Sequence, residues 1–124
     1  MNAASPSLPK IAITMGDPYG IGPEIVVKAV AHAEVKRACQ PIVIGTKDIL
    51  EQAAEIVGGE ISCPVIEPDI PLALELNCFG TISAVAGTAA FAYIKKAVSL
   101  ALAGDVDAVT TAPIHKEAIN LAGY

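Results

Sequence analysis

The stretch that most invites a chemical interpretation is a loop of glycine and proline, Gly16-Asp17-Pro18-Tyr19-Gly20-Ile21-Gly22. Glycine permits positive φ angles and lets a ligand approach bare backbone, and Asp17 could hold a substrate hydroxyl. A helix beginning at Pro23 would present free N–H groups and a positive dipole end, which favour an anion or a polar cofactor edge. The spacing matches neither a Walker sequence nor a GxGxxG fingerprint, so a rigid turn capped by Asp17 also explains the loop.

A second loop, Thr110-Thr111-Ala112-Pro113-Ile114-His115-Lys116, carries the other candidate side chains. Lys116 begins a predicted helix, where the dipole does not favour a cation; this suggests an anionic ligand, although a solvated lysine is the simpler explanation. His115 could act as an acid, a base or a hydrogen-bond donor, or could be structural. The hydroxyl of Thr111 could donate to a phosphate, but strand preference explains a threonine equally well.

Both loops follow predicted strands, and this position motivates the predicted site. Ligands of open α/β sheets bind beyond the carboxyl ends of the strands, so two loops leaving parallel strands of one sheet would lie at the same edge. The candidate catalytic residues are Lys116, His115 and Asp17; the predicted lining of a substrate or cofactor cleft is Gly16, Asp17, Gly20, Gly22, Thr111, His115 and Lys116. No metal ligand is predicted.

The elements that position these loops follow from the apolar spacing. Strands are predicted over residues 10–15, 41–45, 63–66 and 107–111, and helices from Pro23, from Thr46 to 57, over 84–103 and over 114–122. The apolar face of the first helix is predicted to hold Ile25, Val26, Ala29, Val30 and Ala33. Thr46 and Ser83 are the expected N-caps, and residues 67–81 are expected to be extended.

Alternating strands and helices indicate βαβ units with right-handed crossovers. The predicted fold class is therefore α/β, a three-layer α/β/α arrangement around a largely parallel sheet. Residues 1–9 are expected to form a disordered lead-in, and residues 10–124 an α/β domain.

The composition narrows the functional classes. Apolar residues make up 53% of the 124 and charged residues only 17%, which suggests a subunit with a buried interface or a piece of a larger fold. The net charge of −5 argues against a nucleic-acid partner, and no apolar run approaches the roughly 18 residues of a membrane span. The N-terminus lacks a secretory signal and the three cysteines lack metal-site spacing, so reduced thiols in a cytoplasmic protein are expected.

Three motifs in order resemble one enzyme family: GDPYGIGPEI, then GTISAVAGTAAFAYIKKAVSLALAGDVDAV, then TTAPIHKEAINLAG. They are similar to the 4-hydroxythreonine-4-phosphate dehydrogenase family of pyridoxal phosphate synthesis, and the first echoes the opening of isopropylmalate and isocitrate dehydrogenases, which share that fold. The resemblance implies oxidation of a phosphorylated hydroxy amino acid by NAD, followed by decarboxylation, with a divalent metal (Zn, Mg or Co). It also implies a homodimer with its active site in a cleft between two domains.

The chain departs from the family pattern after Tyr124. The family continues into a Gly-His-Thr-Glu stretch, metal-binding histidines and further phosphate-binding cations, and none of these has a counterpart here. The glycine loop and the Pro113-Ile114-His115-Lys116 turn carry over as cleft-lining segments, and no metal ligand does. We therefore expect an incomplete, N-terminal part of a larger two-domain fold, without turnover by itself.

Other functions remain open at this point. A paralogue oxidising a sugar-acid phosphate such as threonate 4-phosphate, or an aromatic cis-dihydrodiol, would share these motifs, and Lys116 favours a phosphorylated substrate. Two readings from other classes are a non-catalytic phosphate- or nucleotide-binding α/β module and a fragment that is stable only when its apolar faces assemble.

Overall fold

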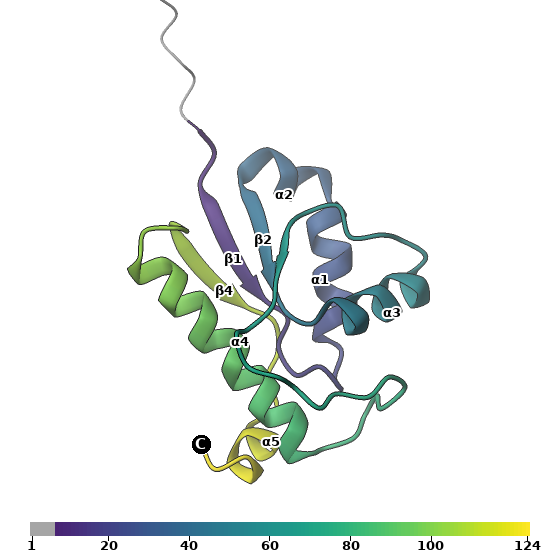
Figure 1. Cartoon of the computed structure of the whole chain (residues 1–124). Coiled ribbons are helices and arrows are strands. Elements are labelled where there is room, and N and C mark those ends of the chain that lie inside the picture. The colour runs from purple at the N-terminus through teal and green to yellow at the C-terminus, as the bar shows by residue number, and fades with distance from the viewer. Residues whose placement is uncertain (1–6) are drawn as a thin grey trace, which may run out of the picture.

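A computed structural model of the chain describes residues 7–124. The predicted lead-in over residues 1–9 lies mostly outside the described residues, and residues 7–9 have no regular secondary structure. The described part forms strands and helices in alternation, as predicted (Figure 1).

Four parallel strands form one sheet in the order β3-β2-β1-β4. They are β1 (Lys10–Thr14), β2 (Gln40–Ile44), β3 (Val65–Ile66) and β4 (Ala108–Thr111). All four predicted strands are present, but β3 has only two residues, since only Val65 and Ile66 pair in register with Val43 and Ile44. β1 lies between β2 and β4, so the first loop predicted to carry chemistry leaves a central strand.

Within residues 7–124, five helices flank the sheet: α1 (Gly22–Ala31), α2 (Ala33–Ala38), α3 (Lys47–Val57), α4 (Ala84–Leu102) and α5 (Lys116–Leu121). α1 packs against α3, whereas α4 packs across β1, β2 and β4 and contacts α5. The chain moves outward from β1 to β3 and then returns to β4 on the other side of β1. With right-handed crossovers, this reversal puts α4 on the face opposite α1 and α3, which gives the predicted three layers (Figure 1).

The first helix is shorter than predicted, and its buried face matches the prediction only in part. Val26, Val27 and Val30 are buried, whereas Ile25 is 42% exposed and Ala33 belongs to α2. The break falls at His32, whose backbone is extended and whose Nδ1 accepts a hydrogen bond from the Glu34 N–H at 3.2 Å. His32 therefore caps α2 and prevents one continuous helix, which the apolar spacing did not indicate.

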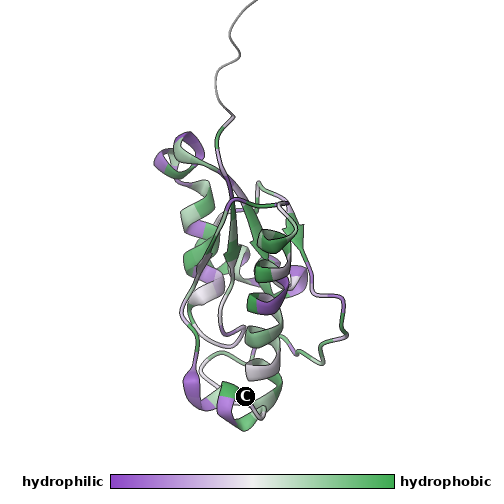
Figure 2. Cartoon of the chain, turned by 90° about the vertical axis from the view of Figure 1, so that its left-hand side faces the viewer, coloured by the Kyte–Doolittle hydropathy of each residue, from purple (hydrophilic) through white to green (hydrophobic). Residues whose placement is uncertain are grey.

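Helix α4 packs its alanines inward and leaves some of its larger apolar residues at the surface. Ala89, Ala90 and Ala97 are fully buried with Tyr93, while Val98 is 45% and Leu102 85% exposed. Small side chains let the helix approach the sheet closely, and Figure 2 shows the hydrophobic strands within the fold.

Contrary to the expectation from the sequence, α4 is long and apolar enough to cross a membrane by length and composition, with a mean hydropathy of 1.3. One such helix is weak evidence for a membrane span, because the core helix of a soluble protein passes the same test; 39% of this window is buried.

The two predicted N-caps have different outcomes. The Ser83 hydroxyl accepts a hydrogen bond from the Ala86 N–H at 3.2 Å, so this cap is confirmed. Thr46 occupies the N-cap position of α3 but makes no capping bond, because its hydroxyl shares a 2.6 Å hydrogen bond with the Tyr93 hydroxyl. The segment between β3 and α4 (residues 67–83, hereafter the strap) contains neither helix nor strand.

Candidate functional site

The two loops predicted to carry chemistry are in direct contact at the carboxyl ends of β1 and β4. The Asp17 N–H donates to the Pro113 carbonyl at 3.1 Å, and the Ala112 N–H donates to the Thr14 carbonyl at 2.9 Å. Since β1 and β4 are parallel neighbours, both loops leave the same edge, hereafter the carboxyl rim. The predicted juxtaposition of the loops is confirmed; that they line a ligand cleft remains a prediction.

Two of the loop glycines are required by contacts within the protein. Gly16 has a φ of +74°, and a Cβ there would lie 2.2 Å from the Pro113 carbonyl oxygen. A Cβ on Gly22 would lie 2.2 Å from the Met15 carbonyl oxygen. A Cβ on Gly20 would make an ordinary contact, 3.5 Å from the Asp17 carbonyl oxygen. The missing side chains at Gly16 and Gly22 therefore allow close backbone packing at these two positions.

Asp17 lies inside the loop, where its carboxylate holds a turn. Its side chain is 5% exposed, its Oδ1 accepts from the Tyr19 N–H at 2.8 Å, and its carbonyl accepts from the Gly20 N–H at 3.1 Å. This is an Asx-type turn, and it supports the structural role of Asp17 that the sequence left open.

The N-terminus of α1 already has a negative group beside it. Ile21 occupies the N-cap position without a side-chain capping bond, and Glu24 lies in the first turn. The Glu24 carboxylate complements the helix dipole and opposes a second anion at the same place. The anion site predicted here from the dipole therefore lacks support from the surrounding charges.

The second loop places its three candidates at the surface. Thr111, His115 and Lys116 are all exposed. The Nδ1 of His115 accepts from the Ala118 N–H at 3.4 Å, so His115 is the N-cap of α5. Lys116 begins α5, and no carboxylate among residues 7–124 lies within salt-bridge distance of its ammonium group. Of the three, Lys116 is the one whose charge is available to a ligand.

Tyr19 and Tyr93 are polar residues of the rim that the sequence analysis did not select. Tyr19 is 6% exposed and sits in the glycine loop, while Tyr93 is fully buried in α4. Burial raises the pKa of the Tyr93 hydroxyl well above its ordinary value, and the nearby negative charges of Glu67 and Asp17 raise the pKa further, against the opposing effect of the Thr46 hydrogen bond. Tyr19 could have been selected from the sequence because it lies inside the glycine motif. Tyr93 lies in an alanine-rich helix, and no sequence pattern marks it.

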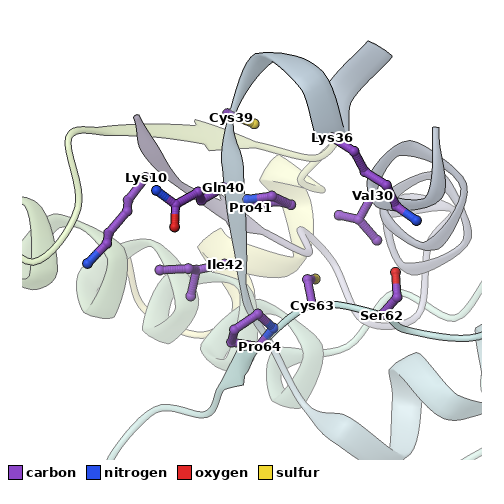
Figure 3. Close-up of a pocket in the computed structure, with 10 residues that line it drawn as sticks. All are labelled: Lys10, Val30, Lys36, Cys39, Gln40, Pro41, Ile42, Ser62, Cys63 and Pro64. Atoms are coloured by element: carbon purple, nitrogen blue, oxygen red, sulfur yellow. The ribbon is translucent and has the colours of Figure 1, made fainter. Parts of the chain in front are cut away.

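A hollow of about 580 Å³ lies at the opposite, amino-terminal edge of the sheet (Figure 3). It surrounds the start of β2, with Pro41 and Ile42 between Lys10 on one side and Lys36 with Cys63 on the other (Figure 3). Burial raises the pKa of the Cys63 thiol, and all three cysteines are free. This hollow and the carboxyl rim are at opposite ends of the same strands, so the two are separate features.

The described residues were compared with the ligand sets of metal sites. No group of three or more histidine, cysteine, aspartate or glutamate side chains that could hold a metal ion occurs within residues 7–124.

Comparison with known proteins identifies the family. Residues 37–124, more than half of the chain, match the family described as pyridoxal phosphate biosynthetic protein PdxA. The chain belongs to the PdxA family. The resemblance inferred from its three motifs is thereby confirmed.

Other PdxA-like proteins match nearly the whole chain. The D-threonate 4-phosphate dehydrogenase of Cupriavidus necator is 43% identical over 131 residues, and the 4-hydroxythreonine-4-phosphate dehydrogenase of Trichlorobacter lovleyi 38% over 132. Each match covers 94% of this chain and 39% of the relative. The crystal structure of a 4-hydroxythreonine-4-phosphate dehydrogenase from Burkholderia phymatum is similar with a TM-score of 0.87 and 44% identity, covering 96% of this chain and 40% of that one. The α/β fold class is confirmed, and the chain spans about two fifths of the length of the relatives it matches.

Proposed function

We propose that this PdxA-family chain is the N-terminal part of a two-domain dehydrogenase that oxidises a phosphorylated hydroxy acid with NAD. The observation that carries the proposal is the match of 94% of the chain to dehydrogenases whose substrates, by their names, bear a phosphate at carbon 4. The first substrate that we propose is 4-phosphohydroxy-L-threonine, oxidised and decarboxylated in pyridoxine 5′-phosphate biosynthesis. The higher identity to the Cupriavidus necator protein favours D-threonate 4-phosphate as a second candidate.

The cofactors belong to this proposal, but their binding groups lie elsewhere. NAD would accept the hydride, and a divalent metal (Zn, Mg or Co) would stabilise negative charge on the oxidised substrate. Because residues 7–124 contain no group of three side chains that could hold a metal ion, we assign the metal ligands to residues outside this segment. We assign the main NAD contacts there as well, because the Cβ directions of Gly16 and Gly22 face protein backbone. We also propose a cytoplasmic homodimer with the active site in a cleft between two domains; the free cysteines are compatible with a reducing compartment.

Within this proposal, the chain supplies a rigid rim and one cation. The mutual packing of the two loops fixes the backbone at the ends of β1 and β4. Lys116 projects from that rim without an ion-pair partner among the described residues, so its ammonium group can attract a substrate phosphate. His115 supports this placement by capping the helix that Lys116 begins.

The proposal is tested with a chimera in which residues 7–124 replace the matching segment of the Cupriavidus necator enzyme. The expected result is NAD-dependent oxidation of D-threonate 4-phosphate, followed as NADH absorbance. A chimera that is folded and has the same oligomeric state as the parent enzyme, yet does not reduce NAD, would contradict the proposed function. Tight binding of a nucleotide by the 124-residue chain alone would instead support a non-catalytic module.

The role of Lys116 is tested in the same chimera. Lys116→Ala should raise KM for the phosphorylated substrate about tenfold, because an ammonium–phosphate contact contributes on the order of 1.5 kcal/mol, and should leave KM for NAD unchanged. Lys28→Ala, which removes an exposed charge from α1, is the matched control. Equal changes in both KM values, or none, would reject the assignment of Lys116 to the phosphate.

A further inference from the structure

The strap (residues 67–83) crosses the carboxyl rim without any helix or strand of its own (Figure 1). Side chains of other elements hold it in place. Near its beginning, Lys96 of α4 pairs with Asp69 at 3.0 Å. Near its far turn, the Gln52 amide of α3 donates to Asn77 Oδ1 at 2.7 Å and accepts from the Asn77 N–H at 3.3 Å. An irregular segment fixed at several points by distant residues is a built feature of the fold, and it lies where ligands of α/β sheets bind.

Tyr19 makes the contact between the strap and the glycine loop. Its hydroxyl accepts from the Glu75 N–H at 3.0 Å, and its carbonyl accepts from the Gly80 N–H at 2.7 Å. Tyr19 is only 6% exposed, so these contacts are made away from solvent. Glu75 and Gly80 thus depend on one residue of the loop for backbone hydrogen bonds that the strap cannot make internally.

Tyr19 is itself fixed by the loops beneath it. Its N–H donates to Asp17 Oδ1 at 2.8 Å, and the Asp17 N–H donates to the Pro113 carbonyl at 3.1 Å. A continuous series of hydrogen bonds therefore runs from the loop after β4, through the loop after β1, to the strap. Three segments that are far apart in sequence are joined at one edge of the sheet.

We infer that Tyr19 is a positioning residue, which holds the strap in place as one wall of the carboxyl-rim site. This inference rests on the proposed function, because the substrate that the wall contacts is the phosphorylated hydroxy acid proposed above. Tyr19 acts through Glu75 and Gly80 and takes no part in hydride transfer. Releasing the strap should therefore weaken substrate binding and leave the chemical step unchanged.

The first experiment measures amide hydrogen exchange in the 124-residue chain. Tyr19→Phe removes the acceptor of the Glu75 N–H, so exchange at Glu75 should increase about fivefold, as expected for the loss of one hydrogen bond. Gln52→Ala releases the strap independently and should produce a similar increase at Asn77. Tyr93→Phe, which deletes a buried hydroxyl bonded to Thr46, is the matched control and should leave exchange over residues 74–80 unchanged. Unaltered exchange at Glu75 in Tyr19→Phe would overturn the assignment.

The second experiment measures steady-state kinetics of the chimera carrying the same substitutions. Both Tyr19→Phe and Gln52→Ala should raise KM for the phosphorylated substrate about fivefold with kcat unchanged, because each releases the same wall by a different contact. A raised exchange rate with an unchanged KM in both variants would overturn the inference, since the strap would then not border the site. An inactive parent chimera would count against the proposed function, whereas an active parent with unaffected variants would count against Tyr19 alone.

Discussion

The packing of the two rim loops through their glycines leads to a quantitative stability prediction. Gly16→Ala introduces two separate penalties, since Gly16 has a φ of +74° and a Cβ there would lie 2.2 Å from the Pro113 carbonyl oxygen. The left-handed backbone costs about 1–2 kcal/mol for a residue other than glycine. Relief of the clash separates the loops, which loses the Asp17–Pro113 hydrogen bond, about 1 kcal/mol, and strains the packing by about 1–3 kcal/mol. The predicted loss is roughly 4 kcal/mol.

Substitutions at three other glycines distinguish the backbone penalty from the steric penalty. Gly58 has a φ of +73° and open space around its Cβ position, so Gly58→Ala should show the backbone penalty alone, about 1 kcal/mol. Gly22→Ala should show the clash alone, about 2–3 kcal/mol, because a Cβ would meet the Met15 carbonyl oxygen at 2.2 Å. Gly20→Ala has neither problem and should change stability by less than about 1 kcal/mol, if anything favourably.

The assay is urea denaturation of the 124-residue chain, with each free energy of unfolding extrapolated to water. A domain of this length has about 6–18 kcal/mol of stability, so a loss of 4 kcal/mol is measurable and leaves a folded population. Refutation would come from a Gly16→Ala variant no less stable than Gly58→Ala. That result would mean that the two loops are not in contact as described.

Two further predictions concern α4. Because burial raises the Tyr93 pKa, the folded state keeps the Tyr93 proton above pH 10, where the unfolded state loses it. The resulting contribution to the free energy of unfolding is complete below pH 10 and declines by up to about 1.4 kcal/mol per pH unit above it. Urea denaturation from pH 8 to 11 should therefore show a steeper alkaline loss for the parent chain than for Tyr93→Phe, and parallel curves would contradict the burial of this hydroxyl. Ala97→Leu should destabilise the chain by about 1–3 kcal/mol through overpacking, whereas Leu102→Ala, at an 85% exposed position, should change the free energy of unfolding by less than about 0.5 kcal/mol. Similar urea midpoints for the two variants would show that α4 does not pack its alanine face inward.

The sequence predicted the fold class and the strand–helix order because these follow from apolar periodicity. It predicted the buried face of α1 only in part, because Val26 and Val30 are buried whereas Ile25 is 42% exposed. In α4 the alanines are inside and Val98 and Leu102 outside, a choice made by close approach to the sheet and not by hydrophobicity alone. The break at His32 depended on a local side-chain hydrogen bond that periodicity does not register.

The candidate site was predictable in its location but less so in the roles of its residues. The adjacency of the two loops followed from parallel strand geometry, and the structure bears it out. The function of Gly16 and Gly22 depends on contacts with Pro113 and Met15, which no local pattern reveals. Tyr19 gains its importance from the strap, whose path could not be derived from a segment without periodicity.

The pairing of β1 with β4 has a consequence for synthesis of the chain. The Lys10 N–H donates to an Asp107 carboxylate oxygen 97 residues later, and residues 11–14 of β1 pair with β4. During translation at about 5–20 residues per second, the first strand emerges and then waits on the order of 5–20 s for its second neighbour. For that interval one side of a strand destined for the middle of the sheet is open to other chains. The nascent polypeptide is therefore most vulnerable to misassociation before its fourth strand leaves the ribosome.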